Sequence, residues 1–499
     1  MRTYSKSKLL ALRQCPKRLW LEIHRPELRQ DSAATQTRFQ VGYQVGDIAR
    51  QLYDPSGDGV LIDVSNSDFR VAFARTQESL LGDRPIFEAA FSAEGALVLA
   101  DVMLPQRAVG QVGWRMVEVK SSTSVKDYHR DDVAVQAYVA RSAGVPLQSL
   151  SLAHVDNSWT YPGNNDYRGL LTEVDLTEEA FSRSDEVRNW IDQARDVDAS
   201  PTEPERSTGP HCDIPYACGF YDYCSRNEPQ AEHPVMWLPR FPAAKTNELR
   251  QRGVIEMRDV PAELLNATQQ RVRTQTLANT VYFDAQGAAA ALAPHGFPAC
   301  FLDFETIQFA APIWAGTRPY QQIPFQFSLH TLDAHGQLQQ TGFLDLSGAD
   351  PSEAFANKLI AACGVSGPIY VYNAAFETTR IAELANRFPA LRDRLLSLNE
   401  RIVDLLPIAR DHYYHPSQQG SWSIKKVLPA AVPDLSYDTL EGVQDGGMAM
   451  EAFLEAIHPA TAAARKSEIQ RQLLAYCQLD TYAMVRLWQV FSGRTELEL

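Results

Sequence analysis

The chain of 499 residues has no uninterrupted apolar run of membrane-spanning length. Its opening segment, MRTYSKSKLLALRQCPKRLW, has neither a long apolar stretch nor a small-residue cleavage site, so we expect no secretory signal. These absences exclude a membrane-spanning class and lead us to expect a soluble, cytoplasmic protein whose cysteines stay reduced. Reduced cysteines favour ligation of a metal or cluster over disulfides.

The sequence also lacks a net positive charge. It has 47 Lys and Arg against 61 Asp and Glu, for a formal net charge of −14. This balance excludes a protein coated in positive charge for non-specific nucleic-acid binding. A local exception is residues 2–25, where seven Lys or Arg stand against one acid, Glu22. Contact with phosphates and a solvated helix face are both open interpretations of this segment.

Internal repeats and low-complexity tracts are absent as well, and the length allows two or three domains. We predict an α/β protein with three regions: 1–230, which mixes helices and strands; 231–294, a helical connector; and 295–499, a second α/β domain with a mixed sheet. Strands are predicted at 299–304, 324–332, 340–344 and 368–372, and helices at 352–362 and 376–387.

Two acids and a lysine occupy neighbouring predicted strands in the first region. Asp101 lies in ALVLADVMLP, and Glu118 and Lys120 lie in RMVEVKSS. Residues i and i+2 of a strand share a face, so Glu118 and Lys120 project together while Val117 and Val119 pack behind them. Such carboxylates can hold Mg²⁺ or Mn²⁺ against a phosphate, with the lysine orienting the attacking water. The alternative is an exposed ion pair on one strand face.

This pattern, followed by a helix that carries Gln136, resembles the core of the PD-(D/E)XK nucleases in their RecB-like branch. The resemblance covers residues 1–230 and implies a metal-dependent nuclease site. Its residues would be Asp101, Glu118, Lys120 and Gln136, with metal bound by Asp101 and Glu118.

The sequence departs from that branch in two places. The branch has a tyrosine four residues after the glutamine, whereas this chain has Ala140 there and Tyr138 two residues earlier. The branch also often has a histidine on an early helix, and FQVGYQVGDIARQL has none. Glu88, in PIFEAAF, is either a further carboxylate near the site or an ordinary strand-edge acid.

Three of the seven cysteines lie in HCDIPYACGFYDYC, at the spacing C-x5-C-x5-C: Cys212, Cys218 and Cys224. Three thiolates make an incomplete tetrahedral site, so a metal there needs a fourth ligand from elsewhere. RecB-like nucleases with an iron-sulfur cluster place one cysteine before the nuclease core and three after it. By that resemblance Cys15, in ALRQCPKRLW, completes a [4Fe-4S] site.

Zinc held by the same four thiolates is the alternative, although the chain has none of the C-x2-C pairs common in zinc sites. We expect the remaining cysteines, which lie in apolar contexts, to be buried packing residues: Cys300, Cys363 and Cys477.

A second set of acids lies in the last region. ACFLDFETI places Asp303 and Glu305 on one face of an apolar strand, where acids are costly unless a cation such as a divalent metal neutralises them. PIYVYNAAFETTRI carries Glu377 at a predicted helix start. LLAYCQLDTYAMVRLW places Tyr476 and Asp480 four residues apart, on one face of a predicted helix.

D-x-E, N-x-x-F-acid and Y-x3-D in this order resemble the DEDD exonuclease superfamily of RNase H-like fold, in its tyrosine-containing subclass. The resemblance implies that Asp303, Glu305, Glu377 and Asp480 bind two metal ions, and that Tyr476 positions the attacking water. Glu377 stands where the superfamily has aspartate.

Two neighbouring features have simpler interpretations. We interpret Asp404, in RIVDLLPIAR, as a helix-start cap. Lys425 and Lys426, in SWSIKKVL, are predicted to be a solvated pair, with contact to backbone phosphate as the alternative.

Together the two halves resemble a family of bacterial proteins in which a RecB-like nuclease with a cysteine cluster precedes an RNase H-like exonuclease. The expected function is metal-dependent hydrolysis of phosphodiester bonds, in DNA rather than RNA, at single-stranded ends or processed duplex, with no membrane partner. The alternative is a nucleic-acid-binding or scaffold protein in which one or both sites are inactive. The two departures from the RecB-like branch and the glutamate at position 377 keep that alternative open.

Overall fold

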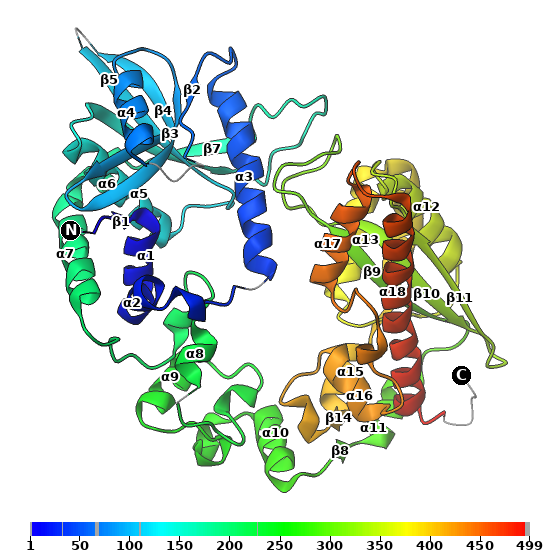
Figure 1. Ribbon diagram of the computed structural model, residues 1–499. Helices are drawn as coiled ribbons and strands as arrows, with labels where there is room; N and C mark the ends of the chain where they lie inside the picture. Colours follow the sequence, from blue (N-terminus) through cyan, green and yellow to red (C-terminus); the bar gives the residue numbers. More distant parts are fainter. Residues whose placement is uncertain (1, 32, 65–68, 109–110, 227, 495–499) are drawn as a thin grey trace. The chain divides into compact units, whose positions relative to one another are not determined.

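The computed structural model describes residues 2–31, 33–64, 69–108, 111–226 and 228–494 (Figure 1). The chain forms two compact units. Unit 1 comprises Met1–Pro229 and Phe309–Gln321, and unit 2 comprises Gln230–Gln308 and Gln322–Leu499. Each unit has its own mixed sheet, so the predicted α/β class is confirmed.

Unit 1 contains the following elements: β1 (Tyr4–Ser5), α1 (Lys6–Gln14), α2 (Pro16–His24), η1 (Pro26–Leu28), α3 (Ala33–Tyr53), β2 (Val60–Leu61), α4 (Phe69–Ser79), β3 (Ile86–Ala93), β4 (Ala96–Ala108), β5 (Gln111–Lys120), α5 (Asp127–Ser142), β6 (Leu147–Val155), β7 (Leu171–Asp175), α6 (Thr177–Ser182), α7 (Ser184–Ala199), η2 (Pro210–Cys212) and α8 (Tyr221–Ser225).

The sheet of unit 1 has the strand order β2-β3-β4-β5-β6-β7, and β1 pairs in parallel with β4. Strand β5 is interior: it is antiparallel to β4 and parallel to β6. Alternate β5 residues divide between two apolar clusters. Met116 belongs to a cluster that includes α5, and Val117 to one that includes Tyr53 of α3. Helices α5 and α3 therefore cover opposite faces, and Glu118 and Lys120 fall on the α5 face.

Unit 2 contains the following elements: η3 (Val235–Trp237), α9 (Ala243–Gln251), η4 (Met257–Asp259), η5 (Ala262–Leu264), α10 (Ala267–Ala278), β8 (Tyr282–Phe283), α11 (Ala285–Leu292), β9 (Ala299–Ile307), β10 (Ile323–Leu332), β11 (Leu338–Leu344), α12 (Ser352–Cys363), β12 (Ile369–Val371), α13 (Ala375–Arg387), η6 (Pro389–Leu391), α14 (Arg392–Asn399), β13 (Ile402–Asp404), α15 (Leu405–His412), β14 (Tyr413–Tyr414), η7 (Pro416–Gln418), α16 (Ile424–Ala431), η8 (Tyr437–Thr439), α17 (Gly446–Ile457) and α18 (Ala463–Ser492). The strands and helices predicted between residues 299 and 387 are all confirmed.

The main sheet of unit 2 has the order β11-β10-β9-β12-β13. Its central strand, β9, is antiparallel to β10 and parallel to β12. Leu302 and Phe304 of β9 pack in a cluster with α12, whereas the ring of Phe301 meets Trp488 of α18. The long helix α18, red in Figure 1, therefore covers the face that carries the odd-numbered residues of β9.

The division into units differs from the predicted regions in two respects. Residues 231–294, predicted as a separate connector, cluster with unit 2 and contain the helices α9, α10 and α11. Residues 309–321, between β9 and β10, belong to unit 1. There Ala310 and Ala311 are buried beside Val45 of α3, and the hydroxyl of Tyr320 donates to the carbonyl of Ser121.

No helix in the described ranges is both long and apolar enough to cross a membrane.

Candidate functional sites

Three of the four acids predicted in the last region meet in unit 2. Asp303 and Glu305 come from β9 and Asp480 from α18. One ligand oxygen from each lies within 4.8 Å of the other two. The period of two along β9 turns both of its acids toward the helix, and α18 presents Asp480 to them. Within the described residues, this is the one group of three potential ligands at such spacing.

The electrostatics of these acids favour a bound cation. Burial, together with the charges of Asp480 and Glu305, raises the pKa of Asp303 well above its usual range. Burial also raises the pKa of Glu305 to about 8 and that of Asp480 to about 6. Crowded, desolvated carboxyls keep their protons unless a cation balances them. Carboxylate oxygens are the ligands that Mg²⁺ and Mn²⁺ prefer, so the donor set fits these ions.

Glu377, the fourth predicted acid, lies in the first turn of α13, outside the group of three. Its side chain is buried, and Oε2 has no hydrogen-bond partner among the described residues. Burial raises its pKa to about 8, and its charge in turn raises the pKa of Asp303. A buried, unpaired carboxyl oxygen near the other acids is a position that a cation would satisfy.

Asp404 caps a helix, as predicted. Its Oδ1 accepts a hydrogen bond from the backbone N–H of Leu406 at 2.9 Å, in the first turn of α15. The same carboxylate accepts from the backbone N–H groups of Asn373 and Ala374 at the start of α13. Asp404 therefore fixes the loop that leads to Glu377 without joining the group of three.

Two tyrosines border Asp480. Tyr476, one turn earlier on α18, is buried, and burial with the charge of Asp480 raises the pKa of its hydroxyl. The second, Tyr437 of η8, donates its hydroxyl proton to Oδ1 of Asp480 over 2.5 Å. We did not predict Tyr437, because DLSYDTL has no periodicity or motif that marks it.

Lys425 completes the surroundings of the acids. Its Nζ lies 5.2 Å from the ring centroid of Tyr476 and 5.5 Å from that of Tyr437. It donates to the carbonyl of Gln444 at 2.6 Å. The prediction that both lysines are solvated is therefore confirmed for Lys426, which is exposed, and wrong for Lys425, which is half-buried. Residues i and i+3 share a helix face, so the spacing from Lys425 to the buried Leu428 was a signal for this difference.

The predicted burial of the three remaining cysteines is confirmed: Cys300, Cys363 and Cys477. Cys477 lies beside the acids, with its Sγ 3.9 Å from Oδ2 of Asp303.

In unit 1, Glu118 and Lys120 meet a second lysine and a second acid. The ammonium of Lys120 donates to Oε1 of Glu118 and, over 2.6 Å, to Oδ2 of Asp132 on α5. Lys6 of α1 reaches the same two carboxylates, 2.9 Å from Oε1 of Glu118 and 3.0 Å from Oδ1 of Asp132. Glu118 is 1% exposed, so the alternative of an exposed ion pair is wrong.

The charges at this site stabilise one another. Burial alone would lower the pKa of Lys120, but the charges of Asp132 and Glu118 outweigh it and raise the pKa well above its usual range. The pKa of Lys6 rises for the same reasons. We did not predict Lys6 or Asp132. Asp132 is four residues before Gln136 on α5, a same-face spacing that was a usable signal, whereas nothing in the sequence links Lys6 to Glu118.

Gln136 and Asp101 also join this site. Gln136 is fully buried, and its Nε2 donates to Oε2 of Glu118 and, at 3.3 Å, to Oδ1 of Asp132. Asp101 accepts the backbone N–H of Val119 at 2.7 Å, which ties β4 to the end of β5. Burial and the charge of Glu118 raise the pKa of Asp101.

Glu88 and Tyr138 have different positions relative to this site. Burial and the charge of Glu118 raise the pKa of Glu88, so it lies near the site and is not an isolated strand-edge acid. Its backbone φ of 55° is left-handed, a strained conformation that often accompanies functional sites. Tyr138 lies instead beside Arg188 of α7, whose Cζ is 6.0 Å from the centroid of the tyrosine ring.

The basic segment 2–25 is not a free basic surface. Each of its seven cations pairs with a carboxylate: Arg2 with Asp198, Lys6 with Glu118, Lys8 with Glu22, Arg13 with Asp131, Lys17 with Glu203, Arg18 with Glu22 and Arg25 with Glu27. These ion pairs balance the charge of the segment within unit 1.

The four cysteines proposed as ligands line one cavity of unit 1: Cys15, Cys212, Cys218 and Cys224. Cys15 lies between α1 and α2, at the N-cap position of α2, and its side chain makes no capping hydrogen bond there. The other three follow α7: Cys212 ends η2, Cys218 lies in the loop after it, and Cys224 belongs to α8. The cavity is also lined by Lys17, Arg18 and Arg206, whose positive charges favour thiolates.

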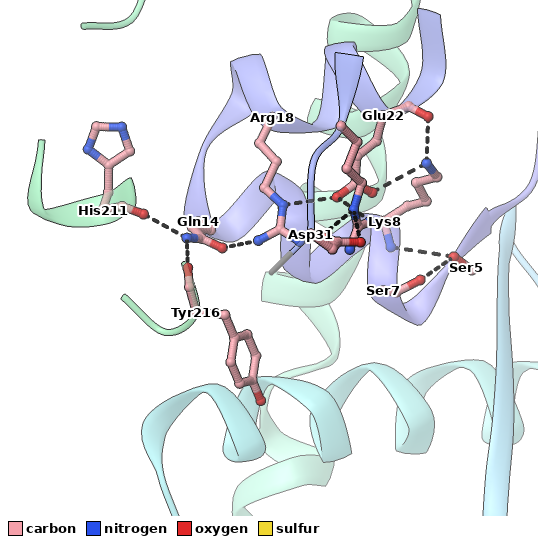
Figure 2. A network of polar contacts seen from close by, with 10 residues as sticks. Ser5, Ser7, Lys8, Gln14, Arg18, Glu22, Asp31, His211 and Tyr216 are labelled. Carbon is pink, nitrogen blue, oxygen red and sulfur yellow. Dashed lines mark hydrogen bonds and ion pairs between the residues drawn. The ribbon is translucent and has the colours of Figure 1, made fainter. Parts of the chain in front are cut away.

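The two segments that supply these cysteines are joined by direct hydrogen bonds (Figure 2). Gln14, next to Cys15, donates from Nε2 to the carbonyl oxygens of His211 and Tyr216, each at 2.7 Å. Arg18 donates to Oε1 of Gln14 and, at 2.9 Å, to Oε1 of Glu22. The cysteine cavity is therefore held together by side chains that are not themselves ligands.

The spacing and acidity of the thiols bear on what they bind. Among the described residues, no three of the four sulfurs lie within 4.8 Å of one another. One zinc ion at about 2.3 Å from each sulfur would draw all four closer than that, whereas a four-iron cluster places each thiolate on a different iron and holds them farther apart. Burial raises the pKa of Cys224 to about 11, so a bound metal would have to displace protons.

In a comparison with known proteins, one family model matches part of the chain. Residues 300–423 match the family described as Domain of unknown function (DUF2779). The match begins in β9 and includes Asp303, Glu305 and Glu377, but it ends before Lys425 and Asp480. No curated protein matches the chain.

Proposed function

We propose that this protein is a metal-dependent nuclease that hydrolyses phosphodiester bonds, with a reaction centre in unit 2. The observation that carries this proposal is the meeting of Asp303, Glu305 and Asp480, with one oxygen from each within 4.8 Å of the others. Buried acids at this spacing repel one another, and divalent cations remove that repulsion.

The surroundings of the acids support the same function. Glu377 offers an unpaired oxygen near Asp303, which suits a second metal position. The central placement of β9 in a five-stranded mixed sheet agrees with the RNase H-like domain that the resemblance implies. Two bound Mg²⁺ or Mn²⁺ ions would stabilise the charge on the attacking and leaving oxygens of the phosphodiester.

The residues of the chain would have distinct roles at this centre. Asp303, Glu305 and Asp480 hold the metal, and Glu377 extends the ligand set. Tyr476, whose hydroxyl is kept protonated by burial, orients the attacking water. Tyr437 holds Asp480 in place through its hydrogen bond. DNA is the proposed substrate, with cleavage at single-stranded ends or processed duplex.

Unit 1 is proposed as a second nuclease site of the PD-(D/E)XK type. Asp101 and Glu118 would bind metal, and Lys120 would orient water, with Gln136 fixing Glu118. The cysteine cavity, which all four cysteines line, would hold a [4Fe-4S] cluster, with zinc as the alternative. Neither proposal is needed for the function of unit 2.

One observation favours a second candidate for unit 1, a nucleic-acid-binding role without cleavage. Both oxygens of Glu118 already accept hydrogen bonds, Oε1 from Lys6 and Lys120 and Oε2 from Gln136. A metal ion would have to displace at least one of these three donors from the carboxylate. If Lys6 stays in place, unit 1 would bind nucleic acid without cleaving it.

End-labelled single- and double-stranded DNA and RNA, incubated with full-length protein and Mg²⁺ or Mn²⁺, test these proposals. We expect digestion from DNA ends that Asp303→Asn lowers and that Asp303→Asn combined with Lys120→Ala abolishes. Asp411→Asn, at an exposed acid of unit 2, is the matched control and should leave digestion unchanged. Lys120→Ala tests unit 1 separately. If this variant digests DNA as fast as wild type, unit 1 binds nucleic acid without cleaving it. Equal digestion by wild type and Asp303→Asn would remove the proposal for unit 2.

A further inference from the structure

We infer that Lys425 binds a non-bridging oxygen of the phosphodiester that is cleaved in unit 2. This inference rests on the proposed nuclease function and adds to it a substrate-binding residue that lies outside the acid motifs. It concerns an anionic ligand, the nucleic-acid backbone, at a site where Asp303, Glu305 and Asp480 are carboxylates and Arg380 is the cation beside Glu377.

The first argument is the hydrogen-bonding capacity of the ammonium. A lysine ammonium has three donors. One of them is used by the carbonyl of Gln444, at 2.6 Å. Among the residues that the structure describes, Lys425 forms no ion pair with a carboxylate, and its one hydrogen bond is the one to Gln444. Two donors therefore remain for a ligand.

The second argument is the way in which the cation is held. Nζ lies 5.2 Å from the ring centroid of Tyr476 and 5.5 Å from that of Tyr437. Aromatic faces attract a cation within about 6 Å but accept no conventional hydrogen bond from it. The rings thus fix the ammonium beside the acids while leaving its protons available. The buried neighbours Val427 and Leu428 anchor the helix α16 that carries it.

The third argument is charge. Asp303, Glu305, Asp480 and Glu377 would repel a phosphodiester wherever metal does not fully neutralise them. Lys425 acts electrostatically on Glu305 and Asp480, so it lies at the same site. A cation with free donors at the margin of an acidic metal site is suited to an anionic oxygen of the substrate, with which it forms a charge-assisted hydrogen bond.

The test compares Lys425→Met with Lys426→Met in the full-length protein. Lys426 is the adjacent lysine, it is exposed, and its one hydrogen bond, to Gln419, is 3.4 Å long. We expect Lys425→Met to lower kcat for digestion of DNA ends by about 100-fold, the effect of removing one preorganised donor to a transition-state oxygen. Lys426→Met should keep wild-type kcat, and Lys425→Arg should recover at least part of the loss.

Two readouts do not depend on cleavage. At a pH above the pKa of Glu305, where protons no longer compete, Mn²⁺ affinity should not weaken in Lys425→Met, because the lysine repels metal and does not bind it. In a cleavage-deficient background of Asp303→Asn combined with Lys120→Ala, adding Lys425→Met should reduce the slope of log affinity for a labelled single strand against log salt by about 0.7, the value for one lost phosphate contact.

The possible outcomes separate this inference from the proposed function. If wild type digests DNA and Lys425→Met behaves like Lys426→Met, the inference is wrong and the proposed function stands. If Lys425→Met loses Mn²⁺ binding or melts well below wild type while Lys425→Arg restores neither, the lysine is structural and the inference is wrong. If neither wild type nor any variant digests nucleic acid, both the proposed function and the inference are overturned.

Discussion

Tyr437 donates its hydroxyl proton to Oδ1 of Asp480 over 2.5 Å, from a short helix 43 residues earlier in the chain. This hydrogen bond lowers the pKa of Asp480 against the effect of burial, which leaves it at about 6. Tyr437 therefore keeps one acid of the proposed metal centre ionised near neutral pH, while Tyr476 lies on the same helix as Asp480.

We predict that Tyr437→Phe weakens Mn²⁺ binding at pH 6 by about tenfold, because a hydrogen bond to a charged group is worth about 1.5 kcal/mol or more. Its loss raises the pKa of Asp480, so protons compete better with metal at pH 6 than at pH 8. Calorimetric titration at the two pH values measures this. Tyr476→Phe should slow digestion and weaken metal binding less than Tyr437→Phe does, because Tyr476 has the smaller effect on the pKa of Asp480. An equal loss of affinity at pH 6 and pH 8 in Tyr437→Phe would contradict the account.

We predict that the metal-free protein loses stability as the pH rises from about 4.5 to 8. Burial raises the pKa of Glu305 and of Glu377 to about 8 in the folded state, above the value in the unfolded chain. The folded state therefore binds more protons in this window, and its stability is lost as these protons leave. Thermal denaturation with a chelator should show the loss, and Mn²⁺ should reverse it at pH 8.

Glu305→Gln should flatten this pH dependence, since glutamine does not ionise. The matched control is Glu353→Gln, at an exposed glutamate of α12, which should keep the wild-type slope. A slope that is unchanged in Glu305→Gln would show that the buried acids do not govern it.

We predict that Lys6→Met lowers the free energy of unfolding of unit 1 by about 3 kcal/mol. The change leaves two buried carboxylates, Glu118 and Asp132, with one lysine, and removing one partner of a buried pair has a cost of this order. Lys8→Met, on the same helix, should cost about 1 kcal/mol or less, because its pair with Glu22 is more exposed and Arg18 still pairs with Glu22. Urea denaturation measures both; similar losses would contradict the buried role of Lys6.

We predict that protein purified without oxygen is brown and contains iron and sulfide. Cys218→Ser should lose the iron and much of the stability of unit 1, because the ligands join segments far apart in the chain. Cys363→Ser, at a buried cysteine of unit 2, should keep its iron. If the protein instead contains stoichiometric zinc without iron or sulfide, the prediction of a cluster is wrong and the four cysteines form a zinc site.

The sequence was sufficient where the evidence is local. The alternation along β9 indicated that Asp303 and Glu305 share a face, and the four-residue spacing on α18 paired Tyr476 with Asp480. The same reasoning placed Glu118 and Lys120 on one face of β5. In each case regular backbone geometry alone determines which side chains lie together.

The contacts that could not be predicted from the sequence depend on tertiary packing. Lys6 meets Glu118 across 112 residues, and Tyr437 reaches Asp480 from an irregular segment. No periodicity connects such partners. Residues 309–321 are a similar case: they follow the strand that carries the acids, but the burial of Ala310 and Ala311 beside α3 assigns them to unit 1.

Mn²⁺ binding to metal-stripped, full-length protein tests the central claim most directly, because the acids of unit 2 can be assessed without knowledge of the substrate. Calorimetric titration at pH 8 should show saturable binding in wild type and in the exposed-acid control Asp411→Asn. Asp303→Asn should bind fewer ions with its fold intact. Wild type that binds no Mn²⁺, or Asp303→Asn that binds as many ions with the same affinity, would contradict a metal centre at Asp303, Glu305 and Asp480.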